Sequence, residues 1–267
     1  VILDAANKVI SNNIERKRKK LWSEKKEGEL IKIQLTGSEI EEADFIADSI
    51  AQIARKENRP YKDFAVLYRA NAQARPVEDA LNRSQIPYNI YGGTKFYERK
   101  EIKDLLAYLR VIQNPQDDIS IKRIINVPRR GIGLRTIEKI EDRANLKQES
   151  IYSVLIDIET NSDISTKARA SISGFVDIIG TLRTIKEVYP VSKLIEKVLD
   201  TTGYMDELVE IRNKNEKDLT GKGEEAQDRI DNLREFISIA LEFESSNDDT
   251  YENKDLETFL TRSEEHT

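Results

Sequence analysis

The residues best suited to chemistry surround a short glycine turn near the middle of the chain. Residues 128–136 read Pro-Arg-Arg-Gly-Ile-Gly-Leu-Arg-Thr and lie between two segments with helical periodicity. Gly131 and Gly133 would leave backbone N–H groups uncovered at the start of the second helix, where the helix dipole favours an anion. The side chains that would surround a phosphate there are Arg129, Arg130, Arg135 and Thr136. This pattern predicts a sequence-independent hold on a duplex backbone. The alternative is an ordinary turn between two helices.

A second group of polar residues follows the apolar run at residues 64–68. Arg69, Asn71 and Arg75 come directly after it, with Tyr68 at its end. In α/β sheets, ligands bind at the carboxyl ends of the strands. The arginines could hold phosphates there, and Asn71 could bind a base edge or the backbone. The alternative is that Tyr68 packs in the core while the arginines are solvated.

A third group lies around Lys95, which follows Gly92-Gly93 and precedes Phe96-Tyr97. A cation next to aromatic rings is a combination used to hold single-stranded nucleic acid. The alternative is a glycine turn followed by aromatic residues of the core.

The residue inventory excludes much enzyme chemistry. The chain has no cysteine, and its single histidine is His266. Thiolate nucleophiles, disulfides, histidine acid–base chemistry and the usual zinc sites are therefore excluded. No Gly-x-x-x-x-Gly-Lys-Ser/Thr motif for a nucleotide phosphate is present. We read Asp117-Asp118 and Asp248-Asp249 as solvated turns, and assign no catalytic or metal-binding residue.

Charge is distributed unevenly along the 267 residues. The net charge is −6, yet basic residues outnumber acidic ones in 95–135, whereas 136–267 is strongly acidic. Local potential guides an anionic ligand more than net charge does. No apolar run approaches the roughly 20 residues of a membrane span. No signal peptide is visible, so we expect a cytoplasmic protein without a membrane partner.

Residues 1–96 alternate between strand and helix patterns. Strands are predicted at 30–35, 64–68 and 88–91, with helices at 3–14, 38–56 and 73–85. Ser38 and Glu41 form a capping-box pattern at the start of the second helix. This alternation predicts part of an α/β parallel sheet that needs further strands.

From residue 97 onward the pattern is all-α. Helical periodicity covers 99–113, 119–126, 134–147, 164–188, 191–200, 204–213, 224–244 and 255–262. The polar stretch 213–225 predicts a mobile loop. We expect residues 262–267 to be a non-native tail, because this sequence is also the translation of a common sequencing adapter.

Taken in order, these motifs resemble the UvrD/PcrA/Rep family of superfamily 1 DNA helicases, and its PcrA branch most closely. The resemblance covers essentially residues 1–261. The matching segments are 5–7, 64–75, 86–88, 92–97, 99–104, 106–112 and 124–133. One departure is Ala74, which stands where relatives often have a serine.

The resemblance implies an internal fragment: a partial RecA-like 2A subdomain at 1–96 and a helical 2B insertion at 97–261. The parent would be an ATP-dependent 3′–5′ DNA helicase of repair or replication. Its ATP and Mg²⁺ sites would lie outside these residues, which we expect to be inactive alone. The implied single-strand contacts are Arg69, Asn71 and Lys95, and the implied duplex contacts are Arg130, Gly131, Gly133, Arg135 and Thr136.

The alternatives belong to other functional classes. One is a helical interaction or regulatory module that docks RNA polymerase or repair proteins, as the family's 2B surfaces do. Another is a subunit of a helicase–nuclease complex. The expected partners are single-stranded DNA and a duplex junction, bound by a monomer.

Overall fold

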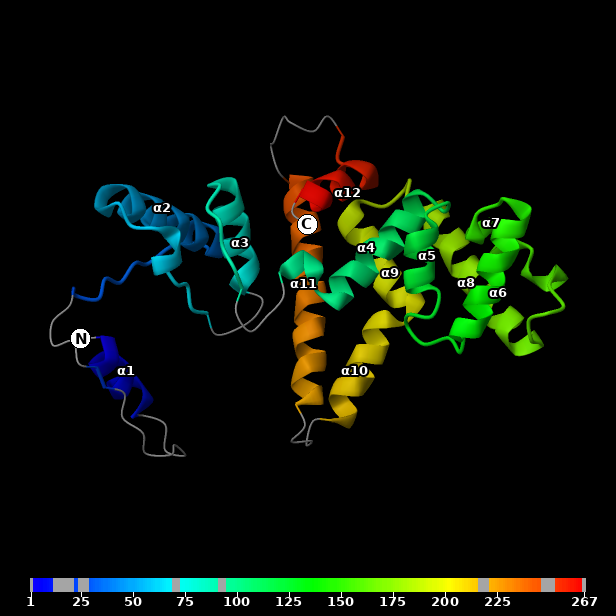
Figure 1. Cartoon of the computed structure of the whole chain (residues 1–267), viewed down its shortest axis with the longest axis horizontal. Coiled ribbons are helices and arrows are strands. Elements are labelled where there is room, and N and C mark those ends of the chain that lie inside the picture. The colour runs from blue at the N-terminus through cyan, green and yellow to red at the C-terminus, as the bar shows by residue number, and fades with distance from the viewer. Residues whose placement is uncertain are drawn as a thin grey trace.

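The computed structural model describes residues 2–11, 22–23, 29–68, 73–90, 95–215, 221–245 and 253–265. Figure 1 shows helices α1 to α3 on one side of α11 and helices α4 to α10 on its other side. The α-helices are α1 Ile2–Ile10, α2 Glu39–Glu57, α3 Ala74–Arg83, α4 Lys100–Gln113, α5 Asp118–Ile124, α6 Leu134–Lys147, α7 Ile151–Ile156, α8 Thr166–Ile185, α9 Val191–Thr202, α10 Tyr204–Lys214, α11 Lys222–Ser245 and α12 Leu256–Glu265. Short 3₁₀ turns are η1 Tyr61–Asp63, η3 Phe96–Glu98 and η4 Ile158–Thr160.

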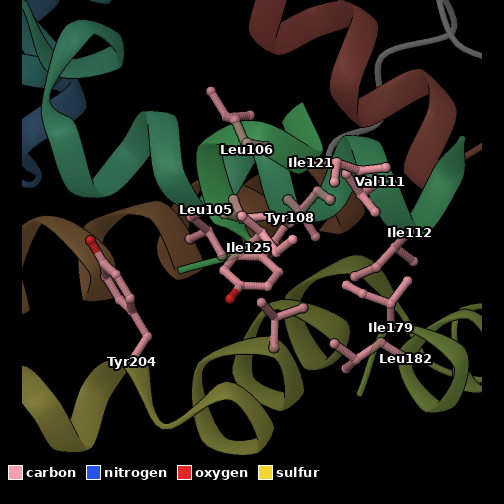
Figure 2. Packing of buried hydrophobic residues seen from close by; sticks show 14 of the residues in the cluster. Leu105, Leu106, Tyr108, Val111, Ile112, Ile121, Ile125, Ile179, Leu182 and Tyr204 are labelled. Atoms are coloured by element: carbon pink, nitrogen blue, oxygen red, sulfur yellow. The ribbon is translucent and has the colours of Figure 1, made fainter. Parts of the chain in front are cut away.

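Helix α4 forms the centre of the larger hydrophobic core, which extends from Phe96 to Leu260. It contacts α5, α8, α9, α11 and α12, and Ile102, Leu109 and Ile112 on it are fully buried. In Figure 2, Ile112 of α4 faces Ile179 and Leu182 of α8. Burying each such side chain contributes about 1.5–3 kcal/mol. The helical periodicity of 97–261 therefore corresponds to a packed helical domain.

A row of aromatic rings holds α11 and α12 against this core. Phe96 stacks on Phe236 with 6.5 Å between ring centroids, and Phe236 meets Phe259 edge-on at 5.6 Å. Phe259 in turn contacts Phe243 at 5.4 Å. Edge-to-face pairs add to the energy of burial. Segments far apart in the sequence are joined by these rings.

A second, smaller hydrophobic cluster lies between α2 and α3. Its buried members are Ala43, Ala47, Ala80, Leu81 and Ile86. Ser38 caps α2 by accepting a hydrogen bond from the amide of Glu41 at 3.2 Å, as the sequence predicted. The Glu41 carboxylate accepts from the amide of Gly37 at 2.7 Å.

The three predicted strands do not form among the described residues. Residues 29–36, 64–68 and 86–90 have no helix or strand hydrogen-bonding pattern. Several apolar side chains of the first two segments are uncovered, with Ile33 86% exposed and Leu67 93% exposed, whereas Ile86 of the third segment is buried. A strand needs a neighbour that pairs with its backbone N–H and C=O groups. No such neighbour is found in the described parts, so the structure does not show the partial α/β sheet expected for 1–96, which stays a prediction.

Two boundaries also differ from the sequence predictions. Helix α10 reaches Lys214 and α11 starts at Lys222, so the predicted loop 213–225 is shorter; residues 216–220 lie outside the described ones. Helix α12 continues to Glu265 and buries Ser263, whose hydroxyl donates to the carbonyl of Phe259 at 2.9 Å. That residues 262–267 are non-native remains a prediction.

Candidate nucleic-acid interface

The predicted glycine turn connects α5 to α6. Ile132 is buried in the helical core, with 1% of its surface exposed, and anchors the turn. Gly131 has φ +75°, a left-handed conformation that favours glycine. Gly133 is the N-cap of α6 with φ −81° and ψ 163°. The turn is therefore a helix–hairpin–helix whose tip is fixed by one buried side chain.

The outer side of this turn carries the features that an anion requires. The first helical hydrogen bond of α6 between residues four apart runs from the amide of Ile137 to the carbonyl of Gly133, at 3.2 Å. The amides of Leu134 and Arg135 precede it and lie in the first turn, where N–H groups need other partners. Arg135 is exposed and Thr136 is partly exposed next to them. Nothing lies within 4 Å of a Cβ placed on Gly131 or Gly133.

Arg130 lies differently from the sequence prediction. Its Nη2 donates to the hydroxyl of Tyr108 at 2.7 Å, and its guanidinium lies 5.3 Å from the centre of the Phe175 ring. The Nη1 group donates at 3.1 to 3.3 Å to a cluster of carbonyl oxygens, those of Ile124, Ile125, Val127 and Pro128. The side chain turns into the protein because these acceptors lie there. In this structure the guanidinium is therefore bound to protein groups, and its contact with a phosphate stays a prediction.

Asn126 completes the hairpin and was missed from the sequence. Its Oδ1 accepts from the amides of Arg130 at 2.8 Å and Ile132 at 3.2 Å. The hydroxyl of Tyr108 donates to the carbonyl of Val127. The only available signal was an asparagine four residues before the second arginine, which is typical of many turns. The position of Tyr108, 22 residues from Arg130, gave no local signal.

Lys95 lies at the start of η3, beside the smaller hydrophobic cluster. Its Nζ is 5.7 Å from the centre of the Tyr88 ring, a cation–π distance. The Tyr88 hydroxyl donates to Oε2 of Glu78 at 3.1 Å. Burial raises the pKa of Glu78 above its ordinary value, and burial beside Glu78 also raises the pKa of Tyr88. Arg69 and Asn71, the other expected single-strand contacts, lie outside the described residues.

Comparison with known proteins decides the family. The model of the UvrD-like helicase C-terminal domain matches residues 1–266. The chain belongs to this family. The predicted resemblance is thus confirmed.

Similar relatives include three proteins named ATP-dependent DNA helicase PcrA. The chain is 41% identical to that of Bacillus subtilis (strain 168) over 260 residues, which cover 97% of this chain and 33% of the relative. It is 40% identical to that of Leuconostoc citreum over 257 residues, 96% of this chain and 32% of the relative. It is 38% identical to that of Staphylococcus aureus (strain Mu50) over 260 residues, 97% and 34% of the two chains. The chain spans about a third of the length of these relatives.

Arg75 of this UvrD-like chain differs from its predicted role as a phosphate ligand. It is 6% exposed and forms ion pairs with Glu235 at 2.8 Å, Glu242 at 3.1 Å and Asp79 at 3.1 Å. Burial alone would lower its pKa, but these carboxylates raise it above the ordinary value. Arg75 thus joins α3 to α11 and is not free to hold DNA.

Among the described residues, no group of three His, Asp or Glu side chains could hold a metal ion. No helix in the described part is long and apolar enough to cross a membrane.

Proposed function

We propose that this chain is the DNA-holding part of an ATP-dependent 3′–5′ DNA helicase. The observation that carries the proposal is the hairpin between α5 and α6. Its two glycines leave open space outside the backbone, and α6 begins there with unbonded amides beside Arg135 and Thr136. Such a surface suits a duplex phosphate and does not read bases.

The hairpin would hold the duplex through few direct contacts. Gly131 and Gly133 allow the DNA backbone to approach the amides of Leu134 and Arg135 closely. The exposed Arg135 guanidinium and the Thr136 hydroxyl would add one charged and one neutral hydrogen bond to phosphate oxygens. Because these groups would all contact the DNA backbone and none would contact a base, binding would be independent of the DNA sequence.

Single-stranded DNA would bind on the other side, next to the smaller cluster. Lys95, held over the Tyr88 ring, is the described residue that supports this proposal. Arg69 and Asn71 remain proposed contacts through the family resemblance. The extended segments of 1–96 carry exposed apolar residues such as Ile33 and Leu67. We propose that strands from elsewhere in a parent chain cover them and complete a RecA-like sheet.

The proposed parent would also supply ATP and Mg²⁺ binding. The relatives are named as ATP-dependent DNA helicases, and this chain corresponds to about a third of their length. ATP would provide the energy for stepping along DNA. The residues of this chain would only hold the two forms of DNA, so we expect the isolated chain not to hydrolyse ATP.

Duplex affinity measured across a salt series tests the hairpin. The Arg135→Ala variant should bind more weakly and lower the log–log salt slope by about 0.9, the value for one lost phosphate contact. The matched control is Arg234→Ala, which removes an exposed arginine from α11 that pairs with Asp231. An Arg135→Ala slope equal to that of the control would make the hairpin an ordinary helix connection.

A further inference from the structure

The structure assigns to Arg130 the role of a positioning residue that shapes the duplex-binding hairpin from inside and does not itself contact phosphate. This inference rests on the proposed function of the hairpin and names the residue that sets its geometry.

The guanidinium of Arg130 first closes the end of α5. The last carbonyl groups of a helix have no partner within the helix. Two of the acceptors of Arg130 Nη1 are the carbonyls of Ile124 at 3.1 Å and Ile125 at 3.3 Å, at the C-terminal end of α5. The other two, Val127 and Pro128, belong to the turn itself. One side chain therefore connects the helix end to the turn.

The same guanidinium is held by two other helices. Tyr108 of α4 accepts a hydrogen bond from Nη2, and its own hydroxyl donates a hydrogen bond to the carbonyl of Val127. A tyrosine hydroxyl is protonated at neutral pH and can donate, and burial raises the pKa of Tyr108 further, to about 12. Phe175 of α8 lies against the guanidinium, with 5.3 Å between Cζ and the ring centre. Both residues are buried in the helical core, so the guanidinium has little freedom to turn outward.

The internal position of Arg130 determines where the outer groups face. With its side chain directed inward, its own amide and that of Ile132 both reach Oδ1 of Asn126. The chain then reverses at Gly131, in the left-handed conformation, and α6 starts at Leu134. The amides of Leu134 and Arg135 face outward because the backbone before them is fixed in this way.

A lysine could not replace Arg130 in this role. An ammonium group has three donors around one atom, whereas the planar guanidinium presents donors to the carbonyl cluster and to Tyr108 at once. If Arg130 instead contacted a phosphate as a charge, lysine would preserve much of that contact. The two roles therefore give opposite expectations for Arg130→Lys.

The experiment compares the 267-residue chain with three variants, Arg130→Lys, Tyr108→Phe and Arg135→Lys. The salt series of Arg135→Ala described above serves as the reference. Duplex affinity is measured from low to high salt, and amide hydrogen exchange of residues 126–133 is measured without DNA. Arg130→Lys should lose at least about tenfold in affinity at every salt concentration, with the slope unchanged. Tyr108→Phe should show a smaller loss of the same kind, whereas Arg135→Lys should bind nearly as the unsubstituted chain does.

The exchange measurement makes the outcome independent of DNA. The amides of Arg130 and Ile132 should exchange faster in Arg130→Lys and Tyr108→Phe, while amides of α11 stay unchanged. Full duplex affinity in Arg130→Lys, or unchanged exchange at residues 126–133, would overturn the inference. If Arg130→Lys fails to fold, Tyr108→Phe decides by the same criteria. Absence of duplex binding by the unsubstituted chain would overturn the proposed function, and the exchange result would still decide the role of Arg130.

Discussion

The guanidinium of Arg75 in α3 forms an ion pair with the carboxylate of Glu235 in α11, with 2.8 Å between Nη1 and Oε1. The two residues are 160 positions apart in the sequence. They join the smaller cluster, between α2 and α3, to the helical core. Because only 8% of the Arg75 side chain and 18% of the Glu235 side chain are exposed, solvent screens this pair weakly. Arg75 therefore helps to fix how the two hydrophobic clusters lie against each other.

Removing Arg75 should loosen this junction. Arg75→Ala would leave Glu235 and Asp79 without their cation in a largely buried position, and breaking such a pair costs about 3–5 kcal/mol. Denaturant unfolding followed by circular dichroism measures the loss. The control Arg83→Ala breaks an exposed pair with Asp44, whose side chains are 54% and 53% exposed, and should cost less than about 1 kcal/mol. Equal stability of the two variants would contradict the junction.

Gly133→Ala should separate folding from DNA binding. Its backbone, at φ −81° and ψ 163°, is one that alanine adopts, and a Cβ there meets no atom within 4 Å. We expect the free energy of unfolding to change by less than about 1 kcal/mol. The added methyl would project where a phosphate must approach, so duplex affinity should fall by about tenfold or more. Calorimetry and duplex titration of the same sample test both parts.

Gly131→Ala is the informative comparison for that variant. Gly131 has φ +75°, where an L-residue with a Cβ is strained by about 1–2 kcal/mol. This substitution should therefore lower stability, whereas Gly133→Ala should not. Equal losses of stability at the two positions would show that the turn has a different conformation.

The helices on both sides of residue 97 were predictable where their signals are local. Ser38 before the apolar periodicity predicted the cap of α2, and the two glycines at 131 and 133 predicted the turn between α5 and α6. The orientation of Arg130 was not predictable in this way. It depends on Tyr108 and Phe175, which come from two other helices, so the sequence around the turn could not distinguish inward from outward.

In the N-terminal part, a local sequence pattern was not enough to predict the structure. Alternation at residues 30–35 indicates a strand face, but a strand also requires a partner, and pairing is not encoded in its own residues. In the described structure Leu30 is 82% exposed and Leu35 is 86% exposed. Local pattern and tertiary context disagree here because the side chains have no covering layer among the described residues.

The stability of the smaller cluster should depend on pH through Glu78. Burial raises the pKa of Glu78 in the folded state, so folding holds its proton more tightly than the unfolded chain does. This contribution is fully present below the unfolded pKa and is lost as pH rises through the folded pKa. Glu78→Gln removes it. The difference in free energy of unfolding, variant minus unsubstituted chain, should increase between pH 4 and pH 8; a decrease would show that the carboxylate is stabilised as an anion.

Lys95 should contribute one positive charge to the binding of single-stranded DNA, and the Tyr88 ring should hold that charge in position. Lys95→Gln should lower the log–log salt slope for a single-stranded oligonucleotide by about 0.7, the value per contact on single strands. Tyr88→Leu removes the ring under the ammonium and should weaken binding with little change in slope, whereas Tyr88→Phe keeps the ring and should bind nearly as well. The control is Lys62→Gln, which removes an exposed lysine. Lys62 precedes residues 64–68, whereas the proposed contacts Arg69 and Asn71 follow them. If Lys62→Gln and Lys95→Gln lower the slope equally, binding follows the overall charge of this part of the chain and Lys95 has no specific role.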